Sequence, residues 1–209
     1  EMVLKINGLA LSIGEGEELL RARAASLLGV PPETVTDLRV IRRSIDARRA
    51  RPPRFVYLLS IRLPDDFPFA VGQMAPGVTV TEESPLPIRK GDAPSDRCTS
   101  PPERRPVVVG SGPAGLFAAL TLVMKGAPVL LLERGKAVPE RIADVRSFWE
   151  EGILNPESHV HFGEGGAGTF SDGKLTSRVK NPYTAWVKGV LTDMGAPAEI
   201  LVEARPHIG

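Results

Sequence analysis

Apolar and polar residues alternate in three segments near the start of the chain, which predicts three strands at residues 2–13, 38–46 and 55–63. Between the first two, residues 17–28 carry Leu20, Ala24 and Leu28 at helical spacing. Gly29 and the prolines that follow it are typical of the end of a helix. We therefore expect a small α+β domain of β-α-β-β order over residues 1–65.

A proline-rich segment follows this domain. Nine prolines fall between residues 64 and 106. Each proline fixes φ and removes a backbone donor, so regular structure is disfavoured. We expect residues 66–105 to form a linker.

The third region, residues 106–209, begins with two apolar strands, at 107–109 and at 128–133, the second of which ends in Glu133. Such strands are typical of a parallel sheet that is buried on both faces. A turn at 110–115 and a helix at 116–125, ended by Gly126, lie between them and complete a βαβ unit.

Further elements are predicted after this unit. We expect a helix over 139–150 with Ile142, Val145 and Trp149 on its apolar face, a glycine-rich loop at 163–173, a helix near 183–194 and a last strand at 199–204. The fold class is therefore α/β, with a Rossmann-like dinucleotide-binding domain after the small α+β domain. The apolar run 107–124 contains three glycines and a proline, so it predicts strand, turn and helix better than a membrane span. No signal peptide is visible, and we expect a cytoplasmic protein without a membrane partner.

The turn between the two strands carries the G-x-G-x-x-G pattern of dinucleotide-binding proteins, in the residues Gly110, Ser111, Gly112, Pro113, Ala114 and Gly115. Gly110 permits the tight turn, Gly112 lets a diphosphate approach the backbone, and Gly115 lets helix and strand pack closely. Pro113 suits the first turn of a helix, whose free N–H groups and dipole favour an anion.

Glu133 ends the second strand, eighteen residues after Gly115. A carboxylate there accepts both hydroxyls of the adenosine ribose. A 2′-phosphate about 4 Å from it would be repelled by about 4 kcal/mol at an intermediate dielectric. The site therefore favours FAD or NAD over NADP.

Several segments together resemble the uncharacterised FAD-dependent dehydrogenases, NAD(P)/FAD-dependent oxidoreductases that carry a small α/β domain before the flavin domain. They are VVVGSGPAGLFAAL at 107–120, LLLERG at 130–135, HFGEGGAGTFSDGKL at 161–175, RRSIDAR at 42–48 and FVYLLSI at 55–61. The resemblance implies FAD as cofactor and hydride or electron transfer as the activity of the full-length parent. Members of that family are much longer, so we expect this chain to be truncated before a later Gly-Asp motif.

The glycine-rich loop is the second candidate part of the cofactor site. Its glycines allow several N–H groups to face one concavity, as in an anion nest. We expect Gly166, Gly168, Thr169, Ser171 and Lys174 to bind the cofactor, and the resemblance implies that Ser171 and Lys174 hydrogen-bond the flavin. Arg134 and Arg141 are candidates to reach the diphosphate, although Arg141 also fits a solvent-facing position on its helix.

Composition excludes several other kinds of site. The single cysteine, Cys98, excludes an internal disulfide, a multi-cysteine zinc site and the CxxC chemistry of disulfide reductases. His159 and His161 lack a third ligand at matching spacing, so no metal site is expected. No catalytic residue or substrate follows from the sequence, because in flavoenzymes the cofactor does the electron chemistry.

Three alternatives stay open. The chain can be an NAD-binding domain without flavin, or a truncated, non-catalytic dinucleotide-binding or RNA-associated module. The RNA alternative rests on seven arginines between Arg39 and Arg54, with Asp46 as the one acid among them. Solvated arginines, or ion pairs with the flavin domain, explain this run better, and a net charge of +1 gives no general affinity for nucleic acid.

Overall fold

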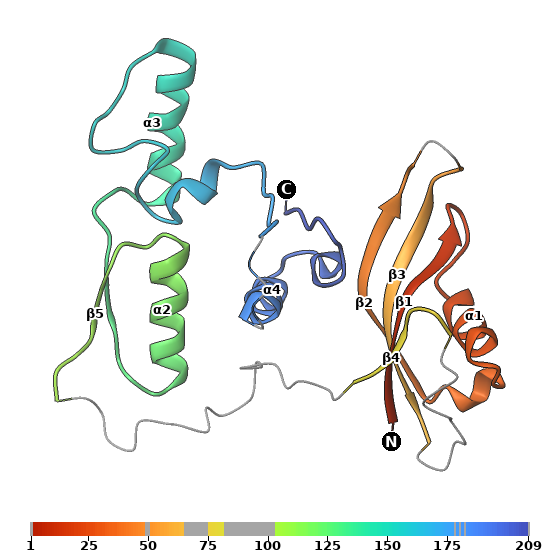
Figure 1. Ribbon diagram of the computed structural model, residues 1–209. Helices are drawn as coiled ribbons and strands as arrows, with labels where there is room; N and C mark the ends of the chain where they lie inside the picture. The colour runs from red at the N-terminus through yellow and green to blue at the C-terminus, as the bar shows by residue number, and fades with distance from the viewer. Residues whose placement is uncertain are drawn as a thin grey trace. The chain divides into compact units, whose positions relative to one another are not determined.

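The computed structural model describes residues 2–48, 51–64, 75–81, 103–177, 179, 181 and 183–208. The chain divides into two compact units (Figure 1), one formed by Glu1–Pro87 with Leu175–Ile208 and the other by Ile88–Lys174. Residues 175–208 thus group with the N-terminal unit in this division. Cys98, Arg49 and most of the predicted linker lie outside the described residues.

The first unit is built on a four-stranded antiparallel sheet in the order β2-β3-β1-β4. Its elements are β1 (Met2–Ser12), α1 (Leu19–Leu28), η1 (Pro32–Thr34), β2 (Asp37–Asp46), β3 (Arg54–Leu63) and β4 (Val78–Val80). The β-α-β-β order predicted from the sequence is confirmed. The strand β4 was not predicted, because it is only three residues long and lies in the proline-rich region; it pairs with β1.

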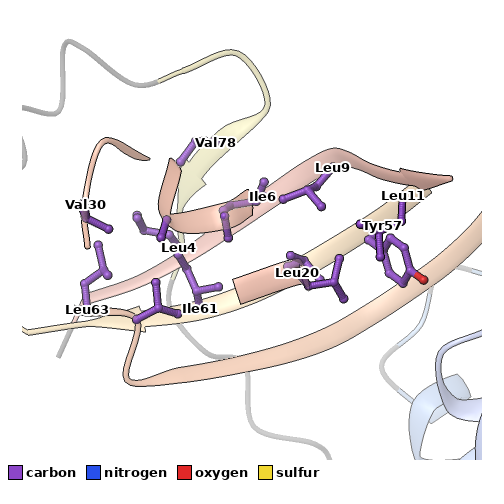
Figure 2. Close-up of a cluster of buried hydrophobic side chains, with 14 residues drawn as sticks. Leu4, Ile6, Leu9, Leu11, Leu20, Val30, Tyr57, Ile61, Leu63 and Val78 are labelled. Carbon is purple, nitrogen blue, oxygen red and sulfur yellow. The ribbon is translucent and has the colours of Figure 1, made fainter. Parts of the chain in front are cut away.

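The core of this unit lies between the sheet and α1. Alternate residues of β1 and β3, among them Leu4, Ile6 and Ile61, are fully buried. Figure 2 shows these side chains grouped with Leu20 of α1. The helix ends at Gly29, whose φ of 68° is left-handed, and the N–H of Val30 bonds the carbonyl of Ala25.

The C-terminal part of the first unit contains α4 (Tyr183–Asp193) and η4 (Ala198–Leu201). The strand predicted at 199–204 is wrong. A 3-10 turn forms there instead, because Ala198 and Glu199 follow Pro197 and favour a helical turn. A parallel bridge relates Arg43 of β2 to Glu203: the N–H of Arg43 donates to the carbonyl of Val202 and the N–H of Ala204 donates to the carbonyl of Arg43. The Arg43 guanidinium also donates to the carboxylate of Glu203.

The second unit contains the βαβ arrangement predicted from the sequence. Its elements are β5 (Val107–Val109), α2 (Pro113–Met124), β6 (Leu130–Leu132), α3 (Val138–Glu151) and η3 (Gly166–Phe170). β5 and β6 pair in parallel, and Pro113 is the first residue of α2. Within the described ranges, no helix is long and apolar enough to cross a membrane.

Two predictions about burial in this unit are wrong. Val109 is 81% exposed and Leu132 47% exposed, because among the described residues α2 packs on only one face of the two-stranded sheet of β5 and β6, and these side chains lie on the other face. In α3 the buried side chains are Arg141 and Val145, whereas Ile142 and Trp149 are exposed.

The contact between α2 and β5 depends on Gly115, and it gives a testable prediction. A Cβ on Gly115 would lie 1.9 Å from the carbonyl oxygen of Gly110. We expect Gly115→Ala to lower the free energy of unfolding by about 1–3 kcal/mol, because backbone must move to relieve the clash. Urea denaturation measures this change.

Gly189→Ala is the matched control, since Gly189 lies inside α4 and a Cβ there would meet no heavy atom of another part of the chain within 4 Å. Alanine is the better helix former, so this variant should gain up to about 1 kcal/mol. A gain in stability for Gly115→Ala as well would contradict the close packing of α2 on β5.

Candidate functional site

The carboxylate of Glu133 is the centre of the candidate site. Its Oε2 accepts hydrogen bonds from the backbone N–H of Ser111 at 2.6 Å and from the Ser111 hydroxyl at 2.9 Å. Its Oε1 accepts from the N–H groups of Gly135 at 2.8 Å and Gly163 at 3.1 Å. The carboxylate therefore joins three segments: the glycine turn after β5, the residues after β6, and the glycine-rich loop at 163–173, which we call the second glycine loop.

These contacts fix the charge of Glu133. Hydrogen bonds from the N–H of Gly135 and then of Ser111 lower its pKa from the ordinary 4.5 to about 2, although partial burial opposes the shift. Glu133 is consequently ionised at neutral pH.

The first glycine turn lies where the two parallel strands end. The N–H of Gly110, which has a φ of 97°, bonds the carbonyl of Leu132 at 2.6 Å. Gly112 is half-buried, and a Cβ there would touch only the Cα of Gly166, at 3.9 Å. Pro113 and Ala114 are exposed at the start of α2. The turn and Glu133, predicted separately from the sequence, thus lie together.

The second glycine loop packs against the first turn. The N–H of Gly165 donates to the carbonyl of Ser111 at 3.0 Å. Gly166 is so close that a Cβ on it would lie 3.0 Å from the Cα of Gly112. Gly135 allows a similar approach, because a Cβ there would lie 2.5 Å from the Cα of Gly163. The two glycine motifs therefore form one surface.

The prediction that this loop is an open anion nest is wrong for five of its amides. The N–H groups of Gly163, Glu164, Gly165, Gly166 and Ser171 all donate within the chain, to Glu133 or to backbone carbonyls. These donors hold the loop in place and are not directed at a ligand.

Arg141 is fully buried, so the prediction that it can face solvent is wrong. Its guanidinium donates to the carbonyls of Glu164, His159, Val160 and Gly166 and to the hydroxyl of Thr169. It therefore supports the second glycine loop from behind.

The other predicted cofactor residues have local partners. Arg134 pairs with Glu157 at 3.0 Å and stacks on Phe162. The Thr169 hydroxyl donates to the carbonyl of Glu164. Gly168, Ser171 and Lys174 are exposed; Ser171 bonds the carbonyl of Gly168, and Lys174 pairs with Asp172 at 2.6 Å. None of these contacts tests their predicted role toward a cofactor.

The rings of His159 and His161 meet edge-on at 5.1 Å. In the part of the chain that the structure describes, no group of three His, Cys, Asp or Glu side chains is arranged to hold a metal ion.

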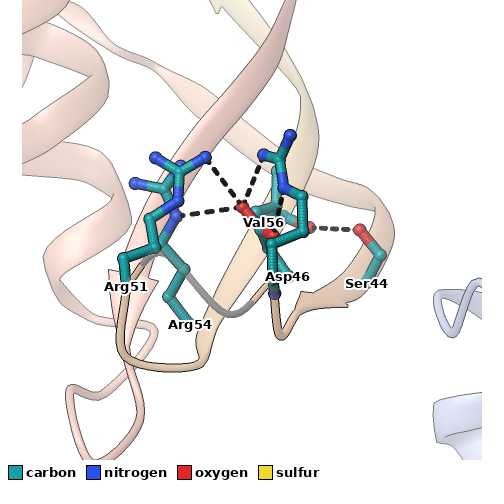
Figure 3. A network of polar contacts seen from close by, with 6 residues as sticks. Ser44, Asp46, Arg51, Arg54 and Val56 are labelled. Carbon is teal, nitrogen blue, oxygen red and sulfur yellow. Dashed lines mark hydrogen bonds and ion pairs between the residues drawn. The ribbon is translucent and has the colours of Figure 1, made fainter.

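Ion pairs within the first unit are formed by Arg39, Arg43, Arg48, Arg51 and Arg54 of the arginine run. Figure 3 shows Arg51 and Arg54 directed at Asp46, with Ser44 bonded to the carbonyl of Val56. Arg48 also pairs with Asp46, and this contact is the main reason why the pKa of Asp46 is well below its ordinary value. Arg43 pairs with Glu17 and Glu203.

Sequence reasoning missed two features that build the site. Gly135 and Gly163 were not among the predicted site residues, although a glycine at both ends of a close backbone contact is a detectable signal. The carboxylate of Glu164 accepts from the N–H of Val138 at 2.8 Å and so satisfies the start of α3. No sequence signal points to that contact.

The lowered pKa of Glu133 predicts a pH-dependent stability. A carboxylate with a depressed folded-state pKa stabilises the fold above the unfolded value, near 4.5, and loses this effect as pH falls toward 2. The stability advantage of wild type over Glu133→Gln should shrink by about half between pH 6 and pH 3, measured as thermal melting. An advantage that is constant with pH would contradict the assigned hydrogen bonds.

Comparison with known proteins adds three findings. Residues 3–62 match a family described as a domain of unknown function (DUF8436), and residues 105–154 match a family described as an FAD binding domain. An uncharacterized protein of Clostridium beijerinckii is 37% identical over 208 residues, which is 100% of this chain and 38% of the relative. The chain thus spans well under half the length of this relative. The second match covers the glycine turn and Glu133, and it supports FAD as the cofactor.

Proposed function

We propose that this chain binds FAD as part of a flavin-dependent oxidoreductase, and that β5, α2 and β6 form a Rossmann-like site for the adenosine diphosphate half of the cofactor. The observation that carries the proposal is the ionised Glu133 carboxylate held against the glycine turn at the carboxyl ends of two parallel strands. That arrangement is how dinucleotide-binding folds hold a ribose and a diphosphate.

The diphosphate would lie at the start of α2. The helix begins with Pro113, which has no N–H, and the following amides of the first turn have no partner inside the helix. Their N–H groups and the helix dipole favour an anion. Gly112 has no side chain to obstruct its approach, so this end of the site fits a diphosphate.

The ribose would lie at Glu133. An ionised carboxylate has about four acceptor positions, and all four are used by Ser111, Gly135 and Gly163. Three of the donors are backbone amides and fix the orientation of the carboxylate. The fourth is the Ser111 hydroxyl, which can rotate away and leave its acceptor position to a ribose hydroxyl. The permanent negative charge disfavours the 2′-phosphate of NADP.

When bound, FAD supplies the hydride or electron transfer, while the chain binds and orients it. The described residues fit the adenosine end of the cofactor. Flavin contacts by Ser171 and Lys174, contacts of Arg134 with the diphosphate, the substrate or electron donor and a cytoplasmic location stay predictions.

Ligand titration tests the proposal. We expect calorimetry to show binding of FAD, weaker binding of NAD and no detectable binding of NADP. Glu133→Gln should weaken FAD binding by about 10–100-fold, because charge-assisted hydrogen bonds contribute about 1.5–3 kcal/mol. Ser111→Ala is the matched control and should bind FAD within about threefold of wild type, since it removes only the replaceable donor.

The alternatives give different results. Tighter binding of NAD than of FAD would favour an NAD-binding domain without flavin. Binding of neither dinucleotide would favour a non-catalytic module and contradict the proposal. An unchanged FAD affinity in Glu133→Gln would show that the carboxylate does not hold the ribose.

A further inference from the structure

The buried guanidinium of Arg141 is an unusual feature of the second unit. It is fully buried on α3, and it has no ion pair with a carboxylate among the described residues. Its Nε has no hydrogen-bond partner there. Burying an unpaired charge is costly unless other polar groups surround it, so the groups around Arg141 indicate its role.

Those groups are mostly the carbonyls of one loop. The two terminal nitrogens of Arg141 reach four backbone oxygens between residues 159 and 166, and the oxygens of His159, Val160 and Gly166 lie at 3.1 Å. The ring of Phe170 lies 4.9 Å from the guanidinium carbon. One side chain thus gathers residues 159–170, which we call the second loop.

The peptide between Glu164 and Gly165 links Arg141 to the first glycine turn. Its carbonyl accepts from Arg141, while its N–H, which points the opposite way, donates to the carbonyl of Ser111 at 3.0 Å. Ser111 in turn donates to Glu133. Arg141 therefore acts on the turn and the carboxylate through a chain of hydrogen bonds, without contacting the open face of the site.

Glycine at position 163 makes this packing possible. Its φ is 116°, and a Cβ there would lie 2.3 Å from Cδ and 2.5 Å from Nε of Arg141. The same residue donates its N–H to Glu133. Gly163 therefore covers Arg141 on one side and binds the site carboxylate on the other.

We propose that Arg141 is the positioning residue of the dinucleotide site: it locks the second loop onto the first glycine turn, so that the two glycine motifs bind an adenosine diphosphate group as one surface. The consequence for ligands rests on the proposed function. The attachment of the second loop to the first glycine turn by Arg141, which we call the lock, is a property of the chain without ligand.

Hydrogen–deuterium exchange of the full chain tests the lock without any ligand. Arg141→Met removes the charge and all donors, and Arg141→Lys keeps the charge but loses the planar fork. Both variants should speed exchange of residues 159–170 by about tenfold or more, because several hydrogen bonds to a charged group are lost, while residues 107–132 change by less than about threefold. Arg146→Met, an exposed position on the same helix, should leave both segments unchanged.

Binding of ADP, measured in the same variants, tests the consequence. We expect Arg141→Met and Arg141→Lys to bind ADP about tenfold more weakly than wild type or Arg146→Met. If exchange of the second loop is unchanged, or rises equally throughout the second unit, the lock is refuted. If the loop responds as expected but wild type binds neither ADP nor FAD, the lock stands and the proposed function fails.

Gly163→Ala keeps the test decisive if the Arg141 variants do not fold. This variant keeps Arg141 but places a Cβ 2.3 Å from its Cδ, so the side chain must move. The amides of the second loop should therefore again exchange hydrogen faster than those of residues 107–132. Equal exchange of the two segments in Gly163→Ala would overturn the proposal.

Discussion

The second unit depends on one carboxylate with four hydrogen-bond donors. The donors of Glu133 come from Ser111, Gly135 and Gly163, which are separated by up to 52 positions along the chain. An ionised carboxylate only accepts hydrogen bonds and an N–H group only donates them. Glu133 is therefore the acceptor in every one of these hydrogen bonds. Together they fix the charge of Glu133 and the positions of three loops at once.

Close backbone approach is the second constraint, and it follows from the first. Loops can share one carboxylate only if no side chains separate them. Gly115 lies against Gly110, Gly135 against Gly163 and Gly166 against Gly112, with gaps that a Cβ would close. A Cβ would therefore crowd its neighbours at Gly115, Gly135, Gly163 and Gly166, and the last two also have a positive φ. Arg141 fills the space behind the loop and gives its carbonyls a partner.

Local patterns predicted the parts of the fold that depend on neighbouring residues. The alternation in β1, β2 and β3 gave correct strands, and the helix expected from residue 116 begins three residues earlier, at Pro113. The spacing of Glu133 from the glycine turn correctly suggested that the two lie together. The roles of Gly163 and Arg141 were not predictable in this way, because they arise from contacts between residues 18 to 30 positions apart along the chain. An arginine on a helix with charged neighbours reads as a surface residue unless the loop that covers it is known. The three-residue strand β4 and the 3-10 turn η4 are too short for periodicity to identify them.

Mapping a bound nucleotide on the chain by NMR tests the central claim most directly. On titration with ADP, the account predicts that backbone amide shifts change at residues 110–116, around Glu133 and along residues 163–167, with little change in the sheet of the first unit. Shifts confined to other residues, or no shifts at ADP concentrations well above those of the protein, would contradict it.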